Sequence, residues 1–212
     1  MTFLVIEGVE GAGKSTQMRR LTAWFERLGV PFTAAREPGG TAVGEAIRGV
    51  LLEREGLDMA PETELFLMLA ARAAFVREVV RPALERGEVV LADRFDLSTY
   101  AYQGYGRGLD VEKIRDMNDV ATGGLRPDLY LVLDLPVSEG MARQEAEGKE
   151  GDRFERSGVA FLERVREGYR ALAEEDILAV RVDAIGTEEE VEARLRAILE
   201  NRFAGTFPDA SV

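Results

Sequence analysis

The chain has 212 residues, 46% of them hydrophobic, with no cysteine, no histidine and a net charge of −12 at pH 7. The missing residue types exclude disulfide scaffolds, thiol nucleophiles, zinc sites of the Cys/His type and Ser-His-Asp arrangements. The negative charge argues against nucleic acid or an anionic membrane as a partner, because both require a basic face. Phosphoryl transfer stays open, since it depends on positioning and charge neutralisation and needs no histidine base.

The length suits one well-packed domain that covers residues 1–212. No apolar stretch reaches the roughly 18 residues that a membrane span needs, and no secretory signal is visible. We therefore expect a cytoplasmic enzyme that acts on small molecules, with neither nucleic acid nor membrane as a partner.

Five short apolar runs, separated by helical stretches, predict an α/β fold. The runs are residues 3–6, 31–35, 89–92, 129–135 and 178–182. Short buried strands joined by helices favour a parallel sheet covered on both faces, with the binding site at the carboxyl ends of the strands.

A complete phosphate-loop motif directly follows the first run. Residues 8–15 read GVEGAGKS, which fits G-x-x-x-x-G-K-S, and a helical stretch comes next. A strand that enters a helix through a glycine-rich turn aims backbone N–H groups and the positive helix end at one point, where phosphates can bind. We expect Lys14 to reach the terminal phosphates and the Ser15 hydroxyl to ligate Mg²⁺. A glycine turn that only caps the helix is the alternative, and it explains less, since motif, strand and helix all agree.

Residues 61–85 predict a long helix, which Pro82 is expected to kink or end. Its apolar positions recur at steps of three and four residues: Leu65, Leu69, Ala73, Val76 and Val80. Met68 and Arg72 lie four positions apart, so they share a face of this helix and could form one wall of a base pocket. Core filling is the alternative for Met68, as it is for Phe66.

Two of the apolar runs end in an aspartate that could hold Mg²⁺ beside a phosphate loop. Asp93 is the stronger candidate, because Arg94 follows it and would place a cation beside a phosphate at the same strand end. A strand-end cap or turn is an equally good interpretation for Asp134.

Several arginines lie at or soon after predicted strand ends, or on a helix that lines that edge: Arg36, Arg48, Arg72 and Arg94. Each alone is expected to be solvated. Together they could hold the phosphate of an anionic acceptor opposite ATP, because guanidinium groups bind phosphate in bidentate fashion.

Between residues 140 and 157 the chain becomes polar and charged, with glycines at positions 148 and 151. We interpret this segment as a mobile flap between two helices, and a solvated connection is the rival interpretation. From Arg202 to Val212 we expect a loosely ordered tail.

The chain resembles the thymidylate kinases, which use ATP to phosphorylate dTMP to dTDP. The matching stretches are IEGVEGAGKST (6–16), REPGGT (36–41), AAR (70–72), DRFDLSTYAYQGYGRG (93–108) and PDLYLVLDL (127–135). REPGGT together with AYQGYGRG is far more specific than the phosphate loop alone. The resemblance is to the bacterial type with an acidic phosphate loop and a basic lid. It implies a P-loop nucleoside monophosphate kinase fold: a five-stranded parallel sheet flanked by helices, a small lid over roughly residues 141–156, and a homodimer.

The resemblance also implies roles for individual residues at dTMP. Those expected to contact it are Glu10, Arg36, Glu37, Arg48, Met68, Arg72, Arg94, Thr99, Tyr102 and Gln103. Arg48 and Arg94 would grip the acceptor phosphate, with Arg36 nearby. Glu10 would face the 3′-hydroxyl, and Tyr102 would pack against the deoxyribose and disfavour a 2′-hydroxyl. Arg72 would address the thymine edge, which Thr99 and Gln103 would help to read.

For ATP and for catalysis, the resemblance implies a second group of residues. Those expected at ATP are Gly8, Glu10, Gly11, Ala12, Gly13, Lys14, Ser15, Thr16 and, near the adenine, Arg143. Ser15 and Asp93 would hold Mg²⁺, and Glu37 would help to organise the metal and water shell. The residues expected to be catalytic are Lys14, Asp93, Arg94 and Arg153, the last of which resembles a lid arginine that closes over the transferring phosphoryl group.

The chain departs from the family's pattern at two places. Met68 stands where relatives usually have a phenylalanine that stacks on thymine, so a softer thioether contact would replace stacking. The flap is also less basic, because Gln144, Glu145 and Glu147 intervene among its cations, which are Arg143, Lys149, Arg153 and Arg156. The sequence leaves open which of these cations touches phosphate.

The reaction that we expect is direct in-line transfer from MgATP to the phosphate of dTMP, without a covalent enzyme intermediate. The nearest rival is a deoxynucleoside kinase, in which Glu37 would act as the base and Arg48 and Arg94 would lack a purpose. A guanine-nucleotide switch is disfavoured because the N-K-x-D motif is absent. Another nucleoside monophosphate kinase is a further alternative, against which REPGGT and AYQGYGRG count.

Overall fold

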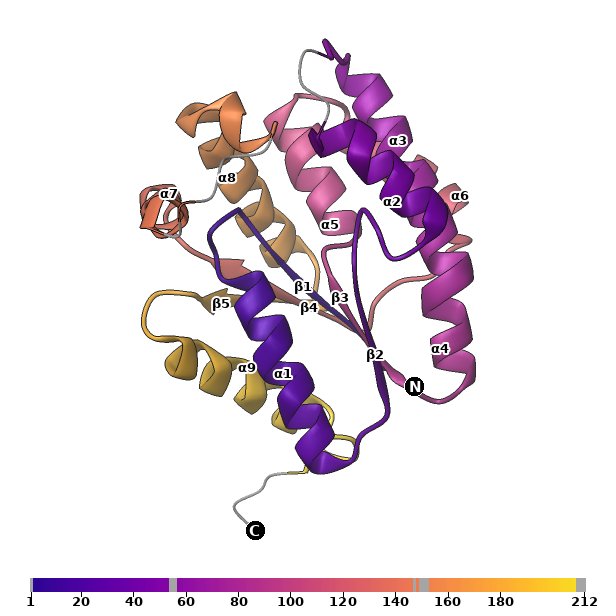
Figure 1. Ribbon diagram of the computed structural model, residues 1–212, viewed down its shortest axis with the longest axis vertical. Helices are drawn as coiled ribbons and strands as arrows, with labels where there is room; N and C mark the ends of the chain where they lie inside the picture. Colours follow the sequence, from indigo (N-terminus) through magenta and orange to yellow (C-terminus); the bar gives the residue numbers. More distant parts are fainter. Residues whose placement is uncertain (1, 54–56, 147, 149–152, 209–212) are drawn as a thin grey trace.

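The computed structural model describes residues 2–53, 57–146, 148 and 153–208. Its centre is a parallel sheet with the strand order β2-β3-β1-β4-β5 (Figure 1). The strands are β1 (Thr2–Gly8), β2 (Phe32–Arg36), β3 (Val89–Asp93), β4 (Leu129–Asp134) and β5 (Ala179–Asp183). Each apolar run that predicts a strand coincides with one of these five, so the parallel α/β fold is confirmed.

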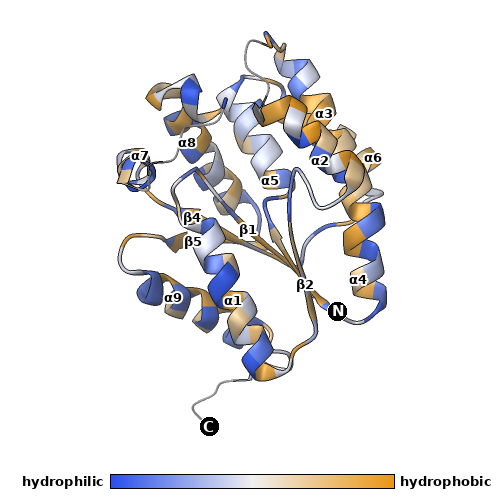
Figure 2. Ribbon diagram, in the orientation of Figure 1, coloured by the Kyte–Doolittle hydropathy of each residue, from blue (hydrophilic) through white to orange (hydrophobic). Residues whose placement is uncertain are grey.

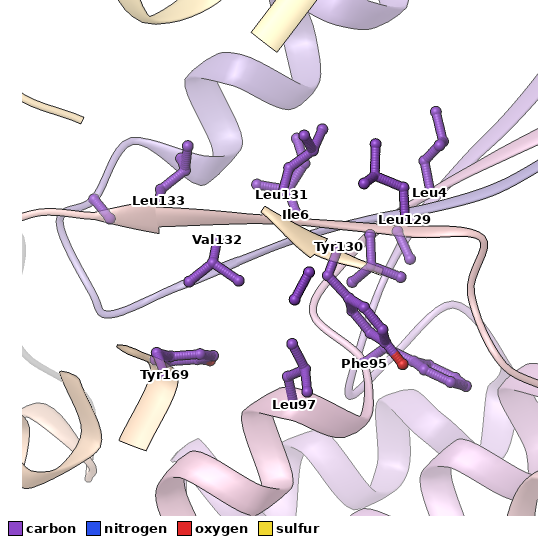
Figure 3. Close-up of a cluster of buried hydrophobic side chains, with 14 of the residues drawn as sticks. Leu4, Ile6, Phe95, Leu97, Leu129, Tyr130, Leu131, Val132, Leu133 and Tyr169 are labelled. Atoms are coloured by element: carbon purple, nitrogen blue, oxygen red, sulfur yellow. The ribbon is translucent and has the colours of Figure 1, made fainter. Parts of the chain in front are cut away.

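The central strands are buried on both faces, which explains why they read as continuous apolar runs. On β4, alternate side chains point to opposite sides of the sheet (Figure 3). Leu129, Leu131 and Leu133 lie on one side, while Tyr130 and Val132 lie on the side of Leu97 and Tyr169. Full burial of one such aliphatic side chain stabilises the fold by about 1.5–3 kcal/mol. In Figure 2 the strands form an apolar centre between helices that carry polar residues.

Helices cover both faces of the sheet (Figure 1). α1 (Lys14–Leu28) and α9 (Glu188–Arg202) pack together on one face, and α5 (Asp96–Thr99) and α8 (Val159–Glu175) lie on the other. The remaining α-helices are α2 (Ala42–Arg48), α3 (Pro61–Phe75), α4 (Arg81–Glu85), α6 (Val111–Thr122) and α7 (Val137–Ala146). Three π-helical segments, η1 (Gly49–Glu53), η2 (Val76–Val80) and η3 (Tyr100–Gly106), and one 3₁₀ turn, η4 (Glu155–Ser157), complete the described elements.

The predicted long helix over residues 61–85 consists of α3, η2 and α4 without a break. The expectation that Pro82 could end it is wrong, because the helix continues to Glu85. Pro82 lies in the first turn of α4, directly after the wider π-helical turn η2. The irregularity expected of a proline, which has no N–H, therefore lies in the π-helical turn, which ends two residues before Pro82.

The expectation of a loosely ordered tail is wrong for residues 203–208. The Phe207 ring is fully buried and stacks on Phe25 and Trp24 of α1, with ring centroids 4.8 and 5.2 Å apart. Burying one phenylalanine side chain contributes about 1.5–3 kcal/mol, which is enough to anchor this short segment. Residues 209–212, also part of the expected tail, lie outside the described residues.

Among the residues that the structure describes, no helix combines the length and the apolar character that a membrane crossing requires.

Candidate active site

The phosphate loop between β1 and α1 adopts a conformation that suits glycine. Gly8, Gly11 and Gly13 have φ angles of 139°, 73° and 92°, which side chains with a Cβ rarely adopt. Gly13 precedes α1 and offers no side chain to cap it. The backbone N–H groups in the first turn of α1 therefore receive no hydrogen bond from a capping side chain. They are suited to bind an anion.

The side chain of Lys14 folds back over the phosphate loop. Its Nζ donates to the carbonyl oxygens of Gly8 at 3.0 Å and Val9 at 2.9 Å. Burial and the positive charge of Arg94 together lower the pKa of Lys14 to about 8, although the negative charges of Asp93 and Glu10 partly oppose this shift. A bound phosphate would favour the charged amine, so Lys14 is well placed to neutralise one.

Helix α7 packs directly against the phosphate loop through two glycines. A Cβ on Gly11 would lie 2.3 Å from the carbonyl oxygen of Gly140, and a Cβ on Gly140 would lie 2.6 Å from the carbonyl oxygen of Glu10. This close approach brings Arg143 beside the loop, where its Nη2 donates to the carbonyl oxygen of Ala184 at 3.2 Å. Sequence reasoning missed Gly140, because nothing near it in the chain indicates such a contact.

Two cavities open at the carboxyl ends of the strands. The first, of about 360 Å³, is lined by every residue that the resemblance assigns to dTMP: Glu10, Arg36, Glu37, Arg48, Met68, Arg72, Arg94, Thr99, Tyr102 and Gln103. The second, of about 540 Å³, is lined by Ala12, Gly13, Thr16 and Arg143 from the set predicted for ATP. Both cavities share Gly11, Lys14, Ser15 and Gln144, so they meet at the phosphate loop.

Arg94 lines the first cavity and has an unusual backbone conformation. Its φ of 73° is uncommon for a residue with a side chain, and such strain is concentrated at functional sites. Its Nη1 donates at 3.1 Å to the Gly8 carbonyl oxygen, to the Ser98 hydroxyl and to the Tyr169 hydroxyl. Its Nη2 donates to Glu10 at 2.7 Å. These bonds fix the guanidinium at the edge of the phosphate loop.

The Glu10 carboxylate accepts hydrogen bonds from Arg94 and Tyr102 and lies near the charge of Lys14. Burial by itself would raise its pKa, but the positive charges of Arg94 and Lys14 and a hydrogen bond from the Tyr102 hydroxyl outweigh burial and lower the pKa. Glu10 therefore stays ionised and can keep Arg94 and Tyr102 in place.

Arg72 is a buried arginine that lines the first cavity. Its Nε donates to Glu37 at 3.0 Å, its Nη1 to Asn118 at 2.9 Å and its Nη2 to the Phe95 carbonyl oxygen at 2.9 Å. Burial raises the pKa of Glu37 to about 7, although Arg72 partly opposes this shift. With three bonds to the protein, Arg72 is rigid and can present only its remaining N–H groups to a base.

The other two arginines predicted for the acceptor phosphate are less enclosed. The Arg36 side chain is 56% exposed and lies 3.3 Å from Glu45. Arg48 donates from Nη1 to the Pro38 carbonyl oxygen at 3.1 Å. Both line the first cavity on the side of β2 and α2.

Two of the predicted site residues, Arg153 and Gly8, are not among the described residues that line either cavity. The Arg153 guanidinium instead donates from Nε to the Leu51 carbonyl oxygen at 3.0 Å and from Nη2 to Glu64 at 2.5 Å. Lys149 and Glu147 of the flap lie outside the described residues.

Ser15 and Asp93 both line the first cavity, and they are the residues that could hold a metal ion. Asp93 Oδ1 is buried without a hydrogen-bond partner among the described atoms, as befits an atom that faces a hydrated cation. The described residues contain no cluster of three metal-binding side chains. This donor set fits Mg²⁺, which typically keeps several waters and binds one or two protein groups together with substrate phosphates.

Asp134 forms ion pairs with helix α8, which neither the Mg²⁺ interpretation nor the strand-end cap interpretation predicts. Its carboxylate accepts from Arg166 at 2.8 Å and from Arg170 at 3.0 Å, both on α8. It lines neither of the two cavities and ties β4 to α8.

Three further residues of the site were not found from the sequence. Phe154 lines the first cavity and packs edge-on against Tyr102, with ring centroids 5.5 Å apart. Ser98 and Tyr169 bind Arg94 and also the buried Glu7, at 2.6 and 3.0 Å. Phe154 could have been noticed as an apolar residue inside a charged flap. Tyr169 gave no such signal, because in the sequence it resembles an ordinary core residue of a helix.

A parallel sheet in this strand order, with a phosphate loop after its central strand and two cavities that meet at the loop, defines a P-loop nucleoside monophosphate kinase. Comparison with known proteins narrows the class. The family model for thymidylate kinase matches residues 6–195. Thymidylate kinase of Desulforudis audaxviator is 48% identical over 206 residues, covering 94% of this chain and 92% of that protein. Thymidylate kinase of Alkalilimnicola ehrlichii is 47% identical over 198 residues, covering 93% and 90%.

The solved structures agree with the sequence relatives. The crystal structure of thymidylate kinase from Ehrlichia chaffeensis has a TM-score of 0.76 at 28% identity, covering 93% of this chain and 98% of that one. The chain belongs to the thymidylate kinase family, whose reaction is the ATP-dependent phosphorylation of dTMP to dTDP.

Proposed function

We propose that this protein transfers the terminal phosphoryl group of ATP directly to the phosphate of dTMP, with the two nucleotides bound end to end. The observation that carries the proposal is the meeting of the two cavities at Lys14 and Ser15. ATP would lie in the second cavity with its adenine near Arg143, and dTMP would lie in the first.

Arg48 and Arg94 would hold the phosphate of dTMP, and Arg36 would approach it from the solvent side. Each charge-assisted hydrogen bond of this kind contributes about 1.5–3 kcal/mol. The acceptor phosphate is already ionised, so no strong general base is required. Glu10 would keep Arg94 in position and face the 3′-hydroxyl, and Tyr102 would pack against the deoxyribose.

Lys14 would leave the carbonyl oxygens of its own loop and neutralise charge on the terminal phosphates. Ser15 and Asp93 would hold Mg²⁺, with Glu37 near the water shell. When bound, this ion supplies additional positive charge to the transferring phosphoryl group.

The thymine base would lie between Met68 and the polar residues Arg72, Thr99 and Gln103. Arg72 is fixed by Glu37 and Asn118, so its donors have a set direction. A rigid donor cannot turn to suit a different base edge, so it discriminates between bases better than a flexible one. It also loses little conformational freedom on binding.

We further propose that Arg153 acts on the transferring phosphoryl group after it leaves Glu64. Arg153→Ala should then lower kcat by up to about a thousandfold with little change in KM for dTMP, as for arginines that stabilise a transition state. Steady-state kinetics with both substrates varied checks this. A variant that loses only thermal stability would instead assign Arg153 to anchoring the flap.

The proposal also includes three further points: the chain forms one domain with a lid over roughly residues 141–156, it assembles as a homodimer, and it is located in the cytoplasm. Family resemblance supports them.

A coupled assay of ADP release with dTMP, dUMP, dCMP, AMP, GMP and thymidine tests the proposed function. We expect dTMP to give the highest kcat/KM and thymidine to give no release above background. Faster release with thymidine than with dTMP would favour a deoxynucleoside kinase, and equal release without any acceptor would favour a nucleotide-hydrolysing switch.

A further inference from the structure

Glu64 is a buried carboxylate that the proposed mechanism does not use. It lies in the first turn of α3 and is fully buried beside the first cavity. A glutamate in this position of a helix commonly complements the helix dipole from the surface. Burial of a charged side chain costs free energy unless it is paired, so its partners indicate what it does.

The partners of Glu64 come from two other segments, and all of them donate N–H groups. Oε1 accepts from Gln103 Nε2 at 2.7 Å and from Arg107 Nε at 3.3 Å. Oε2 accepts from Arg107 Nη2 at 3.3 Å and from Arg153 Nη2 at 2.5 Å. Of these three partners, Gln103 is the one that lines the first cavity as described, and its side chain is buried.

The bond to Glu64 fixes which way round the Gln103 amide lies. A carboxylate accepts hydrogen bonds and cannot donate them, so only the NH₂ end of the amide can face Glu64. The other end of the amide is a carbonyl oxygen, which accepts. An amide that is free to rotate offers a base either a donor or an acceptor, whereas this one is restricted.

We propose that Glu64 determines base specificity by holding the Gln103 amide so that its carbonyl oxygen faces the base. Thymine carries a proton on N3 and can donate it to this oxygen. Cytosine has a bare N3 that only accepts, so the two acceptors would face each other without a proton. The proposal rests on the assignment of Gln103 to the base site in the proposed function.

Glu64 is thus a positioning residue, since it acts through Gln103 and does not touch substrate. Its effect should appear as a change in preference between two bases and not as a general loss of rate. The best matched pair of substrates is dTMP and 5-methyl-dCMP, because they share the methyl group and differ only at N3 and at the group on C4.

The test compares kcat/KM for these two substrates in the full-length protein and its Glu64→Gln variant. A glutamine at position 64 can accept or donate, so the Gln103 amide is free to turn. We expect the dTMP to 5-methyl-dCMP ratio to fall about tenfold, the cost of one mismatched buried hydrogen bond. Glu62→Gln is the control, because Glu62 lies two positions away on the same helix and is exposed; its ratio should equal that of the wild type.

A Gln103→Ala variant separates the two ways in which the idea can fail. If Gln103→Ala changes the ratio and Glu64→Gln does not, Glu64 is only structural and the proposal is overturned. If neither variant changes the ratio, the assignment of Gln103 to the base site is overturned as well.

If Glu64→Gln does not fold, the wild-type protein carries the test. The side-chain amide signals of Gln103 are assigned by NMR through their loss in Gln103→Ala. We expect one of its two N–H protons to exchange slowly with solvent because Glu64 holds it. Fast exchange of both protons would overturn the proposal.

Discussion

Lys14 and Arg94 place two positive charges beside the carboxylate of Glu10, and each charge changes the titration of the others. Burial and Arg94 lower the pKa of Lys14 to about 8, while Arg94 and Lys14 outweigh burial and lower the pKa of Glu10. The pair of shifts keeps Glu10 negative and leaves Lys14 with a proton that is only moderately held. A phosphate that enters this group therefore meets cations that have already been desolvated.

The Lys14 shift predicts a pH dependence. Its pKa in the folded protein lies below the ordinary 10.5, at about 8, so the amine is charged below that pH and neutral above it. We expect kcat/KM for ATP, which at saturating dTMP reports on the dTMP-bound enzyme before ATP binds, to fall as the pH rises through about 8. Rates at saturating dTMP between pH 7 and pH 10 check this, and a profile that is flat to pH 10 would contradict it.

Substitution of Met68 by an aromatic residue is predicted to strengthen the binding of dTMP. Its thioether lines the first cavity where an aromatic ring could stack on thymine. Met68→Phe should lower KM for dTMP by up to about tenfold, since aromatic stacking contributes about 0.5–1.5 kcal/mol. KM for ATP should not change. A sharply raised KM for dTMP would mean that the base does not lie against position 68.

Helix α7 and the phosphate loop act as one unit because their backbones touch at Gly11 and Gly140. No side chain intervenes, so we expect a shift of α7 to move the phosphate loop. The same contact brings Arg143 to the second cavity. We therefore expect binding of ATP to be linked to the position of the flap, whose first residues, 140–146, belong to α7.

Gly140→Ala tests this contact. The new methyl would lie 2.6 Å from the Glu10 carbonyl oxygen, and overpacking of this kind typically costs about 1–3 kcal/mol. We expect a raised KM for ATP together with a lower Tm. Gly205→Ala is the matched control, because a Cβ there meets nothing within 4 Å. If both variants behave like the wild type, α7 does not restrain the loop.

The molecule as a whole exposes an apolar face on α2 and α3, which pack against each other. Val43 on α2 is 51% exposed and Phe66 on α3 is 59% exposed. We expect this face to pair two copies, so that Phe66→Asp yields a monomer in sedimentation velocity while the wild type sediments as a dimer. Ile177→Asp, at another exposed apolar residue, is the control and should remain dimeric. A wild-type monomer would contradict the homodimer.

Features set by short stretches of chain could be predicted from the sequence. The strands follow from apolar runs such as that of β4, and the phosphate loop follows from its glycines and from Lys14. The residues proposed to bind the base and the acceptor phosphate came from resemblance to family motifs, and the structure brings them together in the first cavity. All of these depend on local pattern or on the shared edge of a parallel sheet.

Features that depend on distant segments could not be predicted. Phe207 is buried because its ring packs against Trp24 and Phe25 of α1, which are distant from it in sequence. Its place near the end of the given chain predicted a loose tail instead. From the sequence alone, Glu64 resembles a surface glutamate. In the folded protein, η3 and the flap place Gln103 and Arg153 against its carboxylate. Contacts of this kind depend on how whole elements pack, and no local periodicity encodes them.

The end-to-end arrangement of two nucleotides is tested most directly by a titration with a dinucleotide that joins adenosine to thymidine through a chain of phosphates. If ATP and dTMP occupy the two cavities that meet at Lys14 and Ser15, this compound binds once per chain and competes with both substrates. Competition with only one of them, or with neither, would contradict the arrangement.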